Sequence, residues 1–93
     1  ERGRPTEFTL HQNYPNPFNP TTNISFTLSS PAEVKINLYD AGGRFVKNVY
    51  TNVKSAGTHT TVFEAGTLAS GIYLFEMQVD GKRADVKKML LVR

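Results

Sequence analysis

The chain has 93 residues, which is enough for one domain and too few for two. It contains no cysteine, which excludes a disulfide framework, a thiolate metal site and a cysteine nucleophile. The net charge is +3, but Asp80 and Asp85 interrupt the basic residues near the end of the chain, so we expect no nucleic-acid partner. No stretch approaches the roughly 18 consecutive apolar residues of a membrane span. No signal peptide opens the chain, so we expect a fragment of a longer protein.

The first 22 residues lack the alternation of a strand and are expected to form a linker followed by an extended lead-in. Three prolines lie close together in the lead-in, at positions 15, 17 and 20. Each proline forces the residue before it into an extended conformation and cannot donate a ladder hydrogen bond. The pattern therefore predicts an irregular, polyproline-like strip rather than a helix, with Tyr14 and Phe18 pinning it to the layer beneath.

From residue 23 onward, apolar and polar side chains alternate with the period of a half-buried strand. This alternation predicts strands over residues 23–28 and 34–39, with Ile24, Phe26 and Leu28 on one face of the first. A less regular pattern predicts a third strand over about 45–52. Threonine, valine and phenylalanine, which favour strands, predict a fourth over 58–63. Glycine-rich turns at 40–43 and 54–57 separate these segments.

The clearest strand of the sequence is Ile72–Val79, and it is followed by the clearest hairpin signal, Asp80-Gly81. A type I′ turn needs positive φ at both central residues, which Asp-Gly supplies readily. Residues 83–92 form the partner strand. Its apolar residues change parity around Lys87-Lys88, which predicts a bulge there or an end buried on both faces. In total the pattern predicts an all-β protein, an immunoglobulin-like antiparallel β-sandwich of about seven strands.

The residues that would carry catalytic or metal chemistry are scattered. His11 and His59 have no second ligand at a spacing that suits a metal, and the acidic residues lie mostly in separate loops. Gly42-Gly43 lacks the following Lys-Ser or Lys-Thr of a phosphate-binding loop. We therefore expect no metal, no cofactor and no enzyme, and we expect His59 to be a packed or half-exposed strand residue.

Four segments, in order along the chain, resemble one family. The strip 13–22 followed by Ile24-Ser25-Phe26 resembles the opening motif of the type A C-terminal sorting domains of the type IX, or Por, secretion system. Residues 34–40 with Gly43-Arg44-Phe45-Val46 resemble the next strand and glycine turn of that family. Residues 68–73 resemble its Leu-x-Ser-Gly-hydrophobic-Tyr element, and residues 87–93 resemble its basic and apolar ending.

The resemblance implies a C-terminal secretion and sorting signal, with residues 1–12 as a linker from an upstream cargo domain and 13–93 as the sorting domain. It implies recognition by the outer-membrane secretion machinery and its sorting protease, possible cleavage, and anchoring at the surface. The protein would then be secreted or on the cell surface, reached through the periplasm and outer membrane of a Gram-negative bacterium. The implied recognition residues are Asn13, Tyr14, Pro15, Asn16, Pro17, Phe18, Asn19, Pro20, Gly43, Ser70, Gly71, Tyr73, Lys87, Lys88, Met89, Leu90 and Leu91.

These motifs also have purely structural explanations. The proline-rich strip can cap a sheet edge, Ser70-Gly71 suits a tight turn, and the final strand can serve the core on one face and recognition on the other. A last strand at a sheet edge also predicts strand addition by another chain or a weak dimer. Two further functions stay open, namely a non-catalytic carbohydrate-binding module and a structural spacer of a secreted enzyme. The chain has no tryptophan, the side chain on which flat sugar platforms commonly depend.

Overall fold

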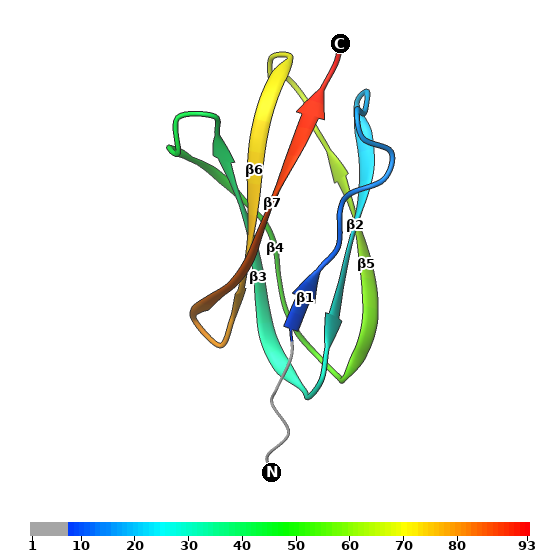
Figure 1. Cartoon of the computed structure of the whole chain (residues 1–93), viewed down its shortest axis with the longest axis vertical. Helices are drawn as coiled ribbons and strands as arrows, with labels where there is room; N and C mark the ends of the chain where they lie inside the picture. The colour runs from blue at the N-terminus through cyan, green and yellow to red at the C-terminus, as the bar shows by residue number, and fades with distance from the viewer. Residues whose placement is uncertain (1–7) are drawn as a thin grey trace.

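Two antiparallel sheets pack face to face in the computed structural model, which describes residues 8–93 (Figure 1). The three-stranded sheet has the order β1-β2-β5, with β1 at Phe8–Leu10, β2 at Thr21–Leu28 and β5 at Gly57–Glu64. The four-stranded sheet has the order β4-β3-β6-β7, with β4 at Phe45–Lys54, β3 at Ala32–Asp40, β6 at Gly71–Val79 and β7 at Lys82–Leu91. The prediction of an immunoglobulin-like antiparallel sandwich of about seven strands is confirmed.

The core lies between the sheets and is built by the alternation read from the sequence. On β2, Ile24, Phe26 and Leu28 are all 2% exposed or less, whereas the residues between them face outward or are half-buried. The inward faces of the other sheet contribute most of the remaining core side chains, which are Val34, Ile36, Leu38, Tyr73, Phe75, Met77, Val79, Met89 and Leu91. Burying these apolar side chains is the main force that holds the two layers together.

The β6–β7 hairpin turns where the sequence predicts it. Asp80 has φ of 51° and Gly81 has φ of 84°, so both central residues occupy the left-handed region that a type I′ turn requires. The backbone N–H of Glu33 donates to Asp80 Oδ1 at 3.0 Å, which ties the turn to the start of β3.

The predicted bulge in the last strand is real but lies elsewhere. Met77 pairs with Asp85 and Gln78 pairs with Arg83, so Ala84 is the extra residue, not Lys87 or Lys88. Beyond this bulge the side chains of β7 alternate regularly between the two faces, with Met89 and Leu91 facing the core. The alternative prediction, an end buried on both faces, is also wrong, since Leu90 is 38% exposed.

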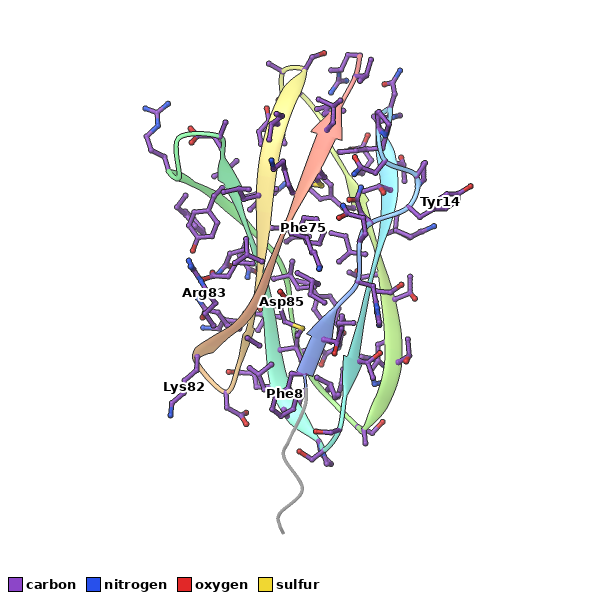
Figure 2. The ribbon with its side chains drawn as sticks, in the orientation of Figure 1. Phe8, Tyr14, Phe75, Lys82, Arg83 and Asp85 are labelled. Atoms are coloured by element: carbon purple, nitrogen blue, oxygen red, sulfur yellow. The ribbon has the colours of Figure 1, made fainter. Side chains whose placement is uncertain are left out.

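The lead-in differs from its prediction at two points. Phe8–Leu10, expected to be part of a linker, pairs with β2 as strand β1, and Leu10 is fully buried. Three residues are too few for alternation to be recognised in a sequence. Residues 1–7 of the expected linker lie outside the described part of the chain. Tyr14 does not pin the strip, because its side chain is 78% exposed and points away from the sandwich (Figure 2). Phe18, at 2% exposed, does so as expected.

Candidate functional site

The motifs identified in the sequence gather at one end of the sandwich, the upper end in Figure 1. The end of β3 at Asp40 pairs with Tyr73 at the start of β6. Gly71 in turn pairs with Leu91 at the end of β7, and Phe18 of the lead-in forms a bridge to Leu91. We call the segments 13–20, 41–44, 68–71 and 88–93 together the motif end. Most of the candidate recognition residues lie on it or directly beside it.

The proline-rich strip occupies the edge of β7. The Phe18 N–H donates to the carbonyl of Leu90 and the Val92 N–H donates to the carbonyl of Phe18, both at 3.0 Å. Between them, the Leu90 N–H donates to the side-chain oxygen of Asn16 at 2.9 Å. The side-chain amide of Gln12 donates to the carbonyl of Lys88 at 2.7 Å. The edge that the sequence led us to expect as free is therefore covered over the C-terminal half of β7.

The other edge of the strip is held by a buried asparagine. Asn13 is 2% exposed, and its amide nitrogen donates to the Pro15 carbonyl at 3.1 Å and to Thr22 Oγ1 at 3.0 Å. The Thr22 hydroxyl donates to the same Pro15 carbonyl at 2.8 Å. The backbone of Tyr14 exchanges two 3.0 Å hydrogen bonds with Asn23. Asn13 therefore fixes the path of the strip.

The later glycine and serine motifs are likewise explained by local structure. Ser70 Oγ accepts a hydrogen bond from the Arg93 N–H at 3.0 Å, and Arg93 also donates from its guanidinium to the Leu68 carbonyl at 2.9 Å. The hydroxyl of Tyr73 donates to the Ala69 carbonyl at 2.7 Å while its ring is buried. This loop therefore clamps the end of the chain.

The glycine turn after β3 is organised by one carboxylate. Asp40 Oδ1 accepts from the backbone N–H groups of Gly42 and Arg44 at 2.9 and 3.0 Å. The bond from the Arg44 N–H is the main cause that lowers the pKa of Asp40. Gly43 sits at φ of 87°, a conformation that costs a residue with a Cβ about 1–2 kcal/mol. Gly43 thus has a backbone role.

The last residues of β7 divide cleanly into buried and exposed sets. Met89 and Leu91 are 1% exposed and belong to the core, and Lys87 is half-buried with the same parity. Leu90 faces outward and pairs with Ile72 on β6, which is 44% exposed, while the neighbouring Lys88 pairs with Leu74. We call Ile72, Lys88, Leu90 and the 47% exposed Val92 the apolar–basic patch. Lys88, Leu90 and Val92 of this patch belong to the closing motif, and their side chains are exposed to solvent.

A buried carboxylate that the sequence reading missed lies on the outer face of the four-stranded sheet. Glu76 Oε2 accepts from Arg83 Nε at 2.8 Å, and Oε1 accepts from the Tyr39 hydroxyl at 2.8 Å and from Gln78 at 3.0 Å. Burial alone would raise the pKa of Glu76, but the hydrogen bonds, that from Arg83 foremost, outweigh it and lower the pKa. Donation to this carboxylate raises the pKa of Tyr39. The sequence offered one sign of this site, because Glu76 is a charged residue at the centre of the predicted strand 72–79.

The histidines and acidic residues of the described chain make no metal site. No group of three or more potential ligands comes together among residues 8–93. His11 lies within 2.8 Å of Thr27 Oγ1, and His59 is a half-exposed strand residue, as predicted, 2.8 Å from the Ser55 carbonyl. No helix that could cross a membrane is found in the described residues.

Comparison with solved structures defines the class of fold. An immunoglobulin-like protein from Pseudomonas aeruginosa aligns over 97% of this chain and 94% of its own, with a TM-score of 0.52 and 10% identity. An alkylpurine DNA glycosylase from Pseudomonas fluorescens, solved with DNA containing an abasic site analog, aligns over 98% of this chain with a TM-score of 0.58 and 18% identity. The chain spans about a third (32%) of that enzyme's length. At these identities the likeness concerns the fold alone, and the class is an immunoglobulin-like β-sandwich.

The family is given by a sequence profile. The profile described as "Secretion system C-terminal sorting domain" matches residues 12–92, nearly the whole chain. The protein therefore belongs to the C-terminal sorting domains of the type IX secretion system, as the motifs suggested. This family is non-catalytic and serves secretion to the cell surface or exterior. No curated protein matches the chain.

Proposed function

We propose that this domain carries an N-terminally attached cargo across the outer membrane of a Gram-negative bacterium, and that the type IX machinery reads it through the apolar–basic patch. Family membership supports a sorting role. The observation that carries the proposal is the exposure of Ile72 and Leu90 as a cross-strand pair beside Lys88. Apolar side chains with a charged rim are typical of protein-binding surfaces.

The burial pattern sorts the motif residues into two roles. We assign contact with the machinery to the exposed residues, chiefly Leu90, Lys88 and Tyr14. The residues that form the core, the turns and the clamp are assigned to building the motif end. These structural residues are Asn13, Asn16, Phe18, Gly43, Ser70, Tyr73, Met89 and Leu91. A substitution of one of these structural residues would impair sorting only by unfolding the domain or by displacing the exposed contact residues.

Cleavage by a sorting protease and anchoring at the surface form the later steps of this proposal. A protease needs an extended segment that is free of ladder hydrogen bonds. From Phe8 onward, β1 is engaged with β2, and Leu10 is buried. We therefore propose that the cut spares Phe8–Leu10, so that the released sandwich remains whole.

The test is export of a reporter fused ahead of residues 1–93 in a host that has the type IX system. Leu90→Ser removes an exposed apolar side chain from edge strand β7 of the four-stranded sheet. Val53→Ser is the matched control, because Val53 is 69% exposed on β4, the opposite edge strand. Thermal unfolding of both purified domains checks that neither change affects the fold.

Export of the wild-type fusion that falls at least several-fold with Leu90→Ser and not with Val53→Ser would support the patch. Equal export of both variants would show that Leu90 is not a contact residue. Periplasmic retention of the folded wild-type fusion would overturn the sorting proposal itself.

The carbohydrate-binding and spacer alternatives receive no specific support. The exposed aromatic residues Tyr14 and Phe45 lie on different sheets, since Tyr14 bridges to β2 and Phe45 begins β4. They do not form the single flat platform that a sugar ring would need.

A further inference from the structure

The two sheets have four edge strands, and three of these carry features that prevent another strand from pairing. β1 has three residues, and its Leu10 N–H is taken by Asp85 at 3.2 Å. β7 carries a bulge and is covered by the lead-in strip. β4 has two register shifts against β3, one between Ile36 and Asn37 and one between Leu38 and Tyr39. Short length, bulges and covered edges are the usual protections of an edge strand.

The fourth edge strand, β5, has none of these protections. It pairs with β2 over eight residues without a register shift, from Thr21 opposite Glu64 to Leu28 opposite Gly57. It contains no proline or lysine and, before Glu64, no charged residue. Its threonine, valine and phenylalanine residues favour a strand. Among residues 8–93, no strand pairs with its outer edge.

The backbone groups on that outer edge can be assigned from the ladder. Asn23 and Ser25 of β2 use their backbone groups toward the lead-in, bonding Tyr14 and His11. In an antiparallel ladder the direction alternates along a strand, so the even-numbered residues of β2 face β5. Their partners on β5 are odd-numbered, as Ile24 opposite Thr61 shows. The free N–H and C=O groups are therefore those of the even-numbered residues, from Thr58 to Glu64.

We propose that β5 pairs antiparallel with β5 of a second copy of this chain, with Thr60 opposite Thr60 of the copy. Thr58 then lies opposite Val62, and His59 opposite Thr61. The side chains of Thr58, Thr60 and Val62 are exposed on the outer face of the sheet. Pairing of the two strands therefore brings these side chains together and leaves the core unchanged. Thr60 and Thr58 already form hydroxyl pairs of 2.9 Å with Ser25 and Thr27 on β2, and the same kind of pair would continue across the new seam.

The distribution of charge favours a second copy as the occupant. The three strands of this sheet contain no lysine or arginine, and Glu64 is their one charged residue. The basic residues that give the chain its net charge of +3 lie outside these strands. Two copies thus meet through their neutral parts, whereas like charges placed directly opposite in a ladder would oppose pairing.

The symmetry of the pair keeps sorting possible. Because the two β5 strands run in opposite directions, the motif end of one copy lies far from that of the other. The contact is one strand wide, and interfaces below about 1,000 Å² are typically weak and transient. We therefore expect association only in concentrated solution or where many copies gather.

Sedimentation velocity of residues 1–93 over a concentration series tests the proposal. Thr60→Lys places like charges opposite each other at the centre of the seam, and Asn23→Lys adds the same charge to the same sheet face on β2, away from the edge. Thr60→Pro removes a free edge N–H, whereas the N–H of Thr61 serves the β2 ladder and is left alone. We expect concentration-dependent association of the wild type and of Asn23→Lys, weakened at least ten-fold in both Thr60 variants.

Circular dichroism and thermal unfolding establish whether the Thr60 variants are folded. If Thr60→Pro does not fold, Thr60→Lys alone decides the test. A wild-type chain that stays monomeric at millimolar concentration would overturn the proposal. Association that Thr60→Lys and Asn23→Lys affect equally would do the same. Neither result bears on export, which the Leu90→Ser experiment measures.

Discussion

Phe18 and Tyr14 belong to the same proline-rich strip, yet the structure assigns them opposite roles. Phe18 is 2% exposed, forms a T-shaped contact with Phe63 at 6.1 Å between ring centroids, and forms backbone hydrogen bonds with Leu90 and Val92. Removing such a ring loses about 2–3 kcal/mol of transfer free energy, and the cavity and lost ring contact bring Phe18→Ala to about 3–5 kcal/mol. Tyr14 is 78% exposed, so Tyr14→Ala should cost less than about 0.5 kcal/mol.

Thermal unfolding followed by circular dichroism distinguishes these values easily. In a domain of this size each kcal/mol shifts the midpoint by roughly 4–8 °C, so Phe18→Ala should lower it by at least about 12 °C and Tyr14→Ala by no more than about 4 °C. Urea unfolding gives the same comparison in free energy. Equal losses in the two variants, or a loss below about 1 kcal/mol for Phe18→Ala, would refute the conclusion that Phe18 anchors the strip.

Two other predictions concern the hairpin and its buried carboxylate. The pKa of Glu76 is lowered in the folded state, so its stabilising effect is present above the unfolded value of about 4.3 and is lost as the pH falls through the folded value. Arg83→Met should therefore destabilise the domain at pH 7 and progressively less below about pH 4, measured by urea unfolding with Lys82→Met as control; a difference that does not depend on pH would contradict this. Gly81→Ala should cost about 1–2 kcal/mol because φ is +84°, whereas Gly42→Ala, whose Cβ would meet Asp40 Oδ1 at an ordinary 3.4 Å, should cost under about 0.5 kcal/mol. Equal losses in the two glycine variants would show that the hairpin does not depend on the left-handed conformation.

Much of the sandwich could be predicted because alternation and turn chemistry are local signals. Ile24, Phe26 and Leu28 are buried as their spacing indicated, and Asp80-Gly81 turns as its residue types indicated. β1 could not be found in this way, because its three residues depend on pairing with β2. The sequence pattern placed the bulge at Lys87-Lys88 instead of Ala84 because Val86 is apolar but faces outward opposite Glu76. Its apolar side chain therefore gives a false indication of which face of β7 is buried.

The candidate site was predictable as a set of segments but not as a surface. The sequence motifs do not say that Met89 is buried while Leu90 is exposed at 38%, because both are apolar and adjacent. That distinction depends on which parity of β7 faces the core, which the bulge determines. Similarly, nothing local to Asn16 indicates that its side chain accepts a hydrogen bond from Leu90, which lies 74 residues away.

Phe8 and the end of β7 lie at opposite ends of the long axis of the sandwich (Figures 1 and 2). Tension between a cargo attached before Phe8 and machinery that grips the motif end would therefore run along the strands. Under such tension the hydrogen bonds that join β1 to β2 and those that join β7 to β6 lie across the direction of the pull. Each set is therefore sheared, and its bonds must break together rather than one after another. In the export role proposed above, this arrangement resists the stepwise separation of the strands while the domain and its cargo are pulled in the same direction.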